Sequence, residues 1–130
     1  MRARRPDPVT PVPPVPPDLS KRARGRWGEA RAAAHYQRLG YTVLDRNWRS
    51  PNGELDLVVE RDGIVVFSEV KARRDDRYGP AAAAVGPAKR RRIRLLAAEW
   101  LDTHRHPRSG IRFDVVAITG VRLDVIESAF

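Results

Sequence analysis

The sequence predicts an α/β protein in which a mixed β-sheet is flanked by helices. Three observations support this fold class. Two apolar, β-branched runs meet at Asp62-Gly63, two segments carry helical periodicity, and two more apolar runs end the chain. The predicted order of the core is therefore helix, three strands, helix and strand.

The composition limits the classes of protein to consider. A chain of 130 residues is large enough for one domain with a single core. It contains no cysteine, which excludes disulfides and zinc-cysteine sites and fits a reducing compartment. No apolar run approaches the ~18 residues that cross a bilayer, and Pro-rich sequence follows the basic residues 1–5. We therefore expect a cytoplasmic protein without a membrane partner.

Residues 1–24 are expected to form a disordered arm rich in proline and arginine. Seven of the eleven prolines lie within residues 1–20, a composition typical of polyproline II or disorder. A basic arm that touches nucleic acid or a partner is one interpretation. A solvated extension or a misassigned start codon is the other, and we prefer it.

The first helix is predicted at residues 25–39, an Ala-rich and charged run. Gly40 follows it at the position where a left-handed residue ends many helices. Glu29 shares a stripe with Ala33 and Tyr36, so it points partly inward in the first turn. An acidic side chain there also suits the helix dipole, and the residues alone leave both explanations open.

Three strands are predicted next, at residues 41–47 and in the hairpin of residues 53–71, with a polar turn at 47–52. Asp62 and Gly63 both tolerate the positive φ of a two-residue type I′ turn, which fixes the register of the hairpin. That register makes the following cross-strand pairs: Val59 with Val66, Val58 with Phe67, Asp56 with Glu69, and Glu54 with Lys71.

The hairpin register places charged residues on one face and apolar residues on the other. Because directly opposed like charges are destabilising, Asp56 and Glu69 either share a proton or hold a cation between them. Glu54 opposite Lys71 makes an ordinary ion pair. We expect the opposite face to be the core; it contains Leu55, Leu57, Val59, Val66 and Val70.

The second helix is predicted to begin at Gly86-Pro87, with proline in the first helical position. Its apolar stripe, which packs on the sheet, consists of Ile93, Leu96, Ala97, Trp100, Leu101 and His104. Lys89 extends this stripe, and Arg90 to Arg92 follow it. The helix dipole disfavours cations at this end, so phosphate binding explains their position better than a solvated face does.

The segment between hairpin and helix, residues 72–86, is a long connection. Loops of this length are usually functional or mobile. Arg73, Arg74 and Arg77 are candidates for phosphate contact, with a solvated basic loop as a comparable alternative. Much of the formal net charge of +9 lies in this segment and its flanks, since residues 71–94 hold nine basic and two acidic residues. A polyanionic partner is therefore expected.

The last two strands are predicted at residues 111–119 and 121–127, with a turn at Gly120. Asp114 lies inside the first of these apolar runs. It could approach the acidic residues of the hairpin, but we prefer a structural role in which it pairs with Arg112 or a loop.

Several motifs along the chain resemble those of known protein families. Asp56, followed by Glu69-Val70-Lys71 on the paired strand, is similar to the motif of the PD-(D/E)xK nuclease superfamily. Over about residues 25–130 the chain resembles more closely the YraN-like family, the bacterial uncharacterised protein family 0102. The matching residues are Gly28-Glu29, Gly40-Tyr41, Gly53 to Leu57, Glu69 to Lys71, Lys89, Arg112 to Val116 and Ala129-Phe130.

The resemblance implies a restriction-endonuclease-like αβββαβ core in residues 25–130, an endonuclease-like domain. It also implies hydrolysis of phosphodiester bonds in DNA with Mg²⁺ or Mn²⁺. Asp56, Glu69 and Lys71 would be catalytic, and the two carboxylates would bind the metal with the Val70 backbone carbonyl. Auxiliary roles, as ligands or in orienting ligands, would fall to Glu29 and Glu54. Nucleic acid would be held by Lys89, Arg90, Arg91, Arg92, Arg73, Arg74 and Arg77.

The sequence leaves the substrate and the class of function open. No finger, winged helix or aromatic platform supplies a sequence target, so branched or damaged DNA is the more natural substrate class. A homodimer would fit branched DNA. The rival hypothesis is a nucleic-acid-binding module that keeps the nuclease fold without turnover, and a third is a structural protein that binds partners through its Pro-rich arm.

Overall fold

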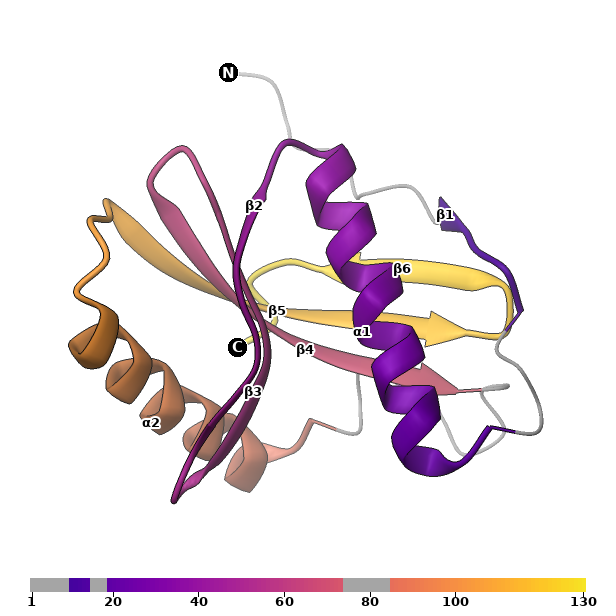
Figure 1. The fold of residues 1–130 in the computed structure, drawn as a ribbon, viewed down its shortest axis with the longest axis horizontal. Helices are drawn as coiled ribbons and strands as arrows, with labels where there is room; N and C mark the ends of the chain where they lie inside the picture. Colours follow the sequence, from indigo (N-terminus) through magenta and orange to yellow (C-terminus); the bar gives the residue numbers. More distant parts are fainter. Residues whose placement is uncertain (1–9, 15–18, 74–84) are drawn as a thin grey trace.

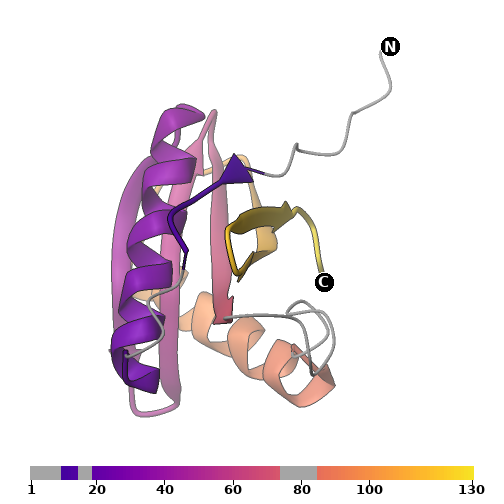
Figure 2. The same ribbon diagram turned by 90° about the vertical axis from the view of Figure 1, so that its right-hand side faces the viewer.

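A computed structural model describes residues 10–14, 19–73 and 85–130 of the chain. A six-stranded sheet lies between two helices, which gives three layers (Figures 1 and 2). In chain order the elements are β1 (Thr10–Pro11), α1 (Lys21–Arg38), β2 (Thr42–Ser50), β3 (Gly53–Arg61), β4 (Ile64–Arg73), α2 (Pro87–His104), β5 (Gly110–Thr119) and β6 (Arg122–Ile126).

The sheet is mixed, with the strand order β1-β6-β5-β4-β3-β2. Strands β4 and β5 pair in parallel, and α2 lies between them in the chain; the other neighbours are antiparallel. A parallel pair requires such a crossover connection. The predicted α/β fold with an αβββαβ core flanked by helices is therefore confirmed. Neither helix in the described part of the chain is long and apolar enough to cross a membrane.

Each face of the sheet has its own apolar core. Under α1 the buried cluster includes Tyr36, Leu57 and Val66. Under α2 the buried cluster includes Phe67 and Trp100. We expected only one face of the hairpin to be core. This is wrong, because α1 covers one face of the sheet and α2 covers the other.

The side on which Leu55 packs also differs from the prediction. It lies in the cluster under α2 with Val58, whereas Leu57 lies under α1. The strict alternation of a strand would put Leu55 and Leu57 on one face. At this end β3 pairs with β2, and Asn47 on β2 has a positive φ of 50° close to the Trp48–Leu55 pair.

Local sequence determines both ends of α1. The helix begins four residues before the predicted Gly25, because the Ser20 hydroxyl accepts a hydrogen bond of 3.1 Å from the Ala23 N–H. At the other end Gly40 has a φ of 89°, as predicted. The Tyr41 N–H donates to the Tyr36 carbonyl at 3.0 Å, which completes a Schellman motif.

The predicted arm contributes to the described structure at two places. Thr10–Pro11 pairs with Arg122 and Leu123 at the edge of the sheet, and residues 21–24 belong to α1. Residues 1–9 and 15–18 lie outside the described residues.

The hairpin turn and register are as predicted. Asp62 and Gly63 have φ values of 53° and 82°, and Val58 pairs with Phe67. The recorded β3–β4 ladder runs from the turn to the Leu57–Ser68 pair. The two strands therefore separate just before the residues predicted to carry the chemistry.

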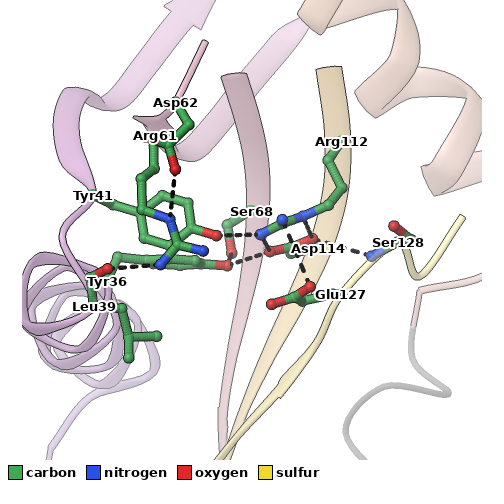
Figure 3. A network of polar contacts seen from close by, with 10 residues as sticks. All are labelled: Tyr36, Leu39, Tyr41, Arg61, Asp62, Ser68, Arg112, Asp114, Glu127 and Ser128. Carbon is green, nitrogen blue, oxygen red and sulfur yellow. Dashed lines mark hydrogen bonds and ion pairs between the residues drawn. The ribbon is translucent and has the colours of Figure 1, made fainter. Parts of the chain in front are cut away.

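Asp114 has the structural role that we preferred. Its side chain is fully buried and accepts two hydrogen bonds from Arg112, of 2.8 and 2.9 Å. The Tyr36 hydroxyl donates to it at 2.8 Å and contacts Ser68 at 3.0 Å. Figure 3 shows this network between α1, β4 and β5. It connects one helix to the central strands.

Candidate functional site

A cleft of about 720 Å³ opens where β3 and β4 separate. Its lining comes from the start of α1, the facing ends of β2 and β3, the carboxyl end of β4 and the start of α2. Ligands of α/β proteins commonly bind beyond the carboxyl ends of strands. Both helices begin at this end of the molecule, the lower edge in both ribbon views (Figures 1 and 2).

Asp56 and Glu69 lie together in the cleft, and we call them the acidic pair. The Val70 N–H donates to the Asp56 carboxylate at 2.9 Å. This side chain therefore links β3 to β4 just beyond the last backbone pair, Leu57 with Ser68. The Glu69 side chain is only 7% exposed. Burial first, and then the negative charge of Glu69, raise the pKa of Asp56 to about 8. The two predicted carboxylates are therefore adjacent, in an environment that disfavours their joint ionisation.

Glu29 projects into the same cleft from α1. Burial raises its pKa, and the charges of Glu54 and Glu69 raise it further, against the hydrogen bond to Asn47. Its Oε2 atom is buried and has no hydrogen-bond partner among the described residues. A buried acceptor of this kind is costly unless something binds it.

Close packing of α1 on β4 brings Glu29 to the site. A Cβ atom added to Gly28 would lie 2.8 Å from the Ala72 Cβ. No side chain fits at position 28 without moving the helix, so glycine allows this approach. Gly28 lets α1 pack closely on β4, and this packing places the Glu29 carboxylate in the cleft.

Glu54 also lines the cleft, but its partner differs from the prediction. The Arg49 Nε donates to it at 3.1 Å across the β2–β3 pair. Lys71 was the expected partner. The separation of β3 from β4 explains the change, because β2 remains the neighbour of β3 at this end.

Two lysines accompany the acidic pair. Lys89, on the first turn of α2, forms an ion pair with Glu69. Lys71 lines the same cleft. Burial first, and then the positive charge of Lys89, lower its pKa, while the charge of Glu69 raises it. The cleft thus combines opposed carboxylates with two amines, one paired with a carboxylate and one with a lowered pKa.

The structure separates the predicted phosphate contacts into groups. Arg73 lines the cleft, and Arg92 lines a smaller adjoining cavity with Lys89. Arg90 is already engaged, because its Nε donates to the Val85 carbonyl at 2.9 Å and its guanidinium lies over Phe130. Arg91 is exposed and lines neither cavity. Arg74 and Arg77 lie outside the described residues.

The sequence analysis missed one group of cleft residues. Four basic side chains from the first two turns of α1 line the cleft: Lys21, Arg22, Arg24 and Arg26. Assigning residues 1–24 to an arm hid the first three, and Arg26, in the predicted helix, was not considered as a cleft residue. The signal that could have found them is the stripe of Glu29, Ala33 and Tyr36, which continues backward by helical spacing to Arg26 and Arg22.

The donor set of the cleft suits a divalent cation that keeps some of its water. Within the described ranges, no three acidic or histidine side chains converge closely enough to hold a metal ion. The acidic pair and a backbone carbonyl are oxygen donors of the kind that Mg²⁺ accepts beside several waters. A cation there would lower the raised pKa of Asp56. The residues therefore fit such an ion.

The fold and the cleft define a mixed α/β protein with recessed carboxylates at the end of its sheet, surrounded by basic side chains. The chain belongs to the uncharacterised protein family UPF0102, whose family model matches residues 28–118. This confirms the resemblance to the YraN-like family.

Several curated relatives match most of the chain. A UPF0102 protein of Frankia casuarinae is 51% identical over 116 residues, which cover 85% of this chain and 98% of that protein. A UPF0102 protein of Rhodococcus jostii is 53% identical over 97 residues, 74% of this chain and 81% of the relative. A UPF0102 protein of Syntrophus aciditrophicus is 41% identical over 110 residues, 82% of this chain and 87% of the relative.

Proposed function

We propose that the cleft is the active site of a Mg²⁺- or Mn²⁺-dependent nuclease of the PD-(D/E)xK type, which hydrolyses phosphodiester bonds in DNA. One observation carries the proposal: the acidic pair lies beside Lys71 in a cleft lined by many basic side chains. Recessed carboxylates suit a metal ion, and surrounding cations suit a phosphate polymer.

Each residue of the motif has a distinct task in this proposal. Asp56 and Glu69 bind the metal through side-chain oxygens, and the Val70 carbonyl is a third protein oxygen. A divalent ion lowers the pKa of bound water and stabilises charge on the phosphate. Lys71 would orient a water molecule at the phosphate or accept its proton, for which the lowered pKa of Lys71 is favourable.

Glu29 and Glu54 support the acidic pair in the same proposal. Glu29 has a buried oxygen without a partner among the described residues, so it is an auxiliary ligand or orients bound water. Glu54 is half-exposed and held by Arg49, which suits an orienting role.

The cleft suggests contact with the backbone of DNA, not with its bases. None of the described residues that line it is aromatic, so it offers no surface on which bases could stack. Backbone contacts position a strand without reading its sequence. Branched or damaged DNA is therefore the substrate class that we propose, and a homodimer would suit branched DNA.

The Lys89–Glu69 ion pair favours a second candidate function. An ammonium group already neutralises one member of the acidic pair, so the site could be stable without metal. The protein would then be a nucleic-acid-binding module with a nuclease-like fold. Turnover distinguishes the two candidates.

The test is a cleavage assay with the full chain and labelled branched, single-stranded and duplex DNA in Mg²⁺ or Mn²⁺. We expect Asp56→Asn and Lys71→Met to lower the cleavage rate by roughly 100-fold or more. Asp62→Asn is the matched control, since it makes the same change at the exposed hairpin turn. Binding without cleavage of any of these DNAs would favour the binding module, and cleavage that both variants retain would contradict the proposed site.

A further inference from the structure

Apart from Arg49, which is paired with Glu54, the basic residues of the cleft come from two sets of elements around the acidic pair. One set, the α1 wall, consists of Lys21, Arg22, Arg24 and Arg26. The other set, the β4–α2 wall, consists of Lys71, Arg73 and Lys89. The α1 wall comes from a helix on one face of the sheet, and the β4–α2 wall comes from β4 and from the helix on the other face. The two helices begin at the same end of the molecule (Figure 2).

The charges of the α1 wall are unfavourable for the helix that carries them. The first turn of α1 contains no acidic residue, so its cations face the positive end of the helix dipole. Arg22 and Arg26 are also four residues apart, a spacing at which like charges repel. A helix start arranged in this way is better suited to an external anion than to stability.

The described carboxylates leave most of the charge of the α1 wall unpaired, although the charge of Arg26 acts on Glu29. None of its four side chains forms an ion pair with a described carboxylate. The Nε atom of Arg24 is buried and has no hydrogen-bond partner among those residues. This wall therefore differs from the β4–α2 wall, where Lys89 is paired with Glu69.

The form of the anion follows from the two walls. A single phosphate ion at the α1 wall would make no use of the basic residues of the β4–α2 wall. A phosphodiester backbone presents charges at regular intervals, so successive phosphates can contact both walls while one passes over the acidic pair. The absence of aromatic residues from the described lining fits contact with the backbone alone.

We propose that the first two turns of α1 are a contact surface for a phosphodiester backbone, which crosses the acidic pair from the α1 wall to the β4–α2 wall. The inference rests on the proposed function for the substrate class of this cleft. It assigns DNA binding to Lys21, Arg22, Arg24 and Arg26. It also gives α1 a second task beyond supplying Glu29.

The experiment measures binding separately from hydrolysis. Binding of a labelled oligonucleotide to the full chain is followed by fluorescence anisotropy in EDTA, over a series of salt concentrations. One arm uses the single strand, and the other uses the same sequence as a duplex. The test variant is Arg22→Gln with Arg26→Gln. The control, Arg31→Gln with Arg38→Gln, removes the same charge from exposed positions of α1 outside the cleft.

We expect the test variant to lose affinity on the order of 20-fold at 0.1 M salt, and the control to change it less than threefold. The slope of log affinity against log salt should fall by about 1.4 for a single strand or about 1.8 for a duplex. The arm in which the unaltered chain binds more tightly identifies the form of the strand. A thermal midpoint of the test variant no lower than that of the unaltered chain shows that folding does not cause its loss of affinity.

Two outcomes would overturn the inference. One is an equal loss of affinity in the test and control variants, which would assign binding to net charge alone. The other is failure of the unaltered chain to bind either DNA at 50 mM salt. Loss of binding in the test variant alone supports the α1 wall even where no DNA is cleaved, so failure of the nuclease proposal is measured separately.

Discussion

Two carboxylates of the central sheet, Asp114 on β5 and Asp56 on β3, have opposite surroundings. Asp114 accepts two hydrogen bonds from Arg112, one from the Tyr36 hydroxyl and one of 3.1 Å from the Ser128 N–H. Each of its oxygens has a donor, and its charge faces a guanidinium. Folding alone explains this residue.

Asp56 has far less support. Its carboxylate accepts a hydrogen bond from the Val70 N–H, and the negative charge of Glu69 adds to the effect of burial in raising its pKa. Folding alone does not explain a carboxylate placed beside a second carboxylate. Burial of an acidic residue therefore does not by itself indicate a functional site. A buried carboxylate with too few hydrogen-bond donors and no cation beside it is the better indicator.

The largest expected effect concerns the fully paired carboxylate. Asp114→Asn keeps the size of the side chain but leaves Arg112 without its charged partner, which should cost about 3 kcal/mol of unfolding free energy. Urea unfolding measures the difference. Asp124→Asn on β6 is the control and should change stability by less than about 0.5 kcal/mol. A cost for Asp114→Asn no greater than the control would remove the distinction between the two carboxylates.

The acidic pair should behave in the opposite way without metal. Asp56→Asn removes a like-charge contact and should be neutral at low pH and stabilising near pH 8. Because the pKa of Asp56 is raised from 3.8 to about 8, its folded form keeps a proton that the unfolded chain releases. Stability of the unaltered chain should therefore fall as pH rises from about 4 to 8.

Melting in EDTA across this pH range measures the effect. The thermal midpoint of the unaltered chain should fall over this range by more than that of Asp56→Asn, because the variant has no carboxyl group to titrate at this position. Curves that run parallel at all pH values would show that Asp56 does not carry a raised pKa.

The smallest expected effect concerns Lys89. Its ion pair with Glu69 competes with any cation at the acidic pair, so Lys89→Gln should strengthen Mn²⁺ binding about fivefold, roughly 1 kcal/mol. Isothermal titration calorimetry measures the affinity. Arg91→Gln, an equal loss of charge on the exposed side of α2, should leave it within twofold. Weaker Mn²⁺ binding in Lys89→Gln would mean that the lysine supports the metal site instead of competing with it.

Local patterns in the sequence predicted much of the fold. The Asp62-Gly63 turn fixed the register of β3 and β4, and Gly40 marked the end of α1, because both depend on residues within a few positions. Pro87 marked the start of α2 in the same way. These elements need no information about distant parts of the chain.

The details of the cleft were harder to predict because they depend on packing. Where β3 leaves β4, the pairing with β2 decides that Leu55 packs under α2 and that Glu54 meets Arg49. The crossing of α2 over the sheet decides that Lys89 reaches Glu69. The early start of α1 at its Ser20 cap decides that Arg22 faces the cleft.

The most direct test of the central claim is thermal melting of the unaltered chain and of Asp56→Asn, each with and without Mn²⁺. We predict that Mn²⁺ raises the midpoint of the unaltered chain by mass action, and that Asp56→Asn abolishes this shift without lowering the metal-free midpoint. A midpoint that Mn²⁺ leaves unchanged in both proteins, with Asp56→Asn clearly destabilised, would contradict the account and make the acidic pair structural.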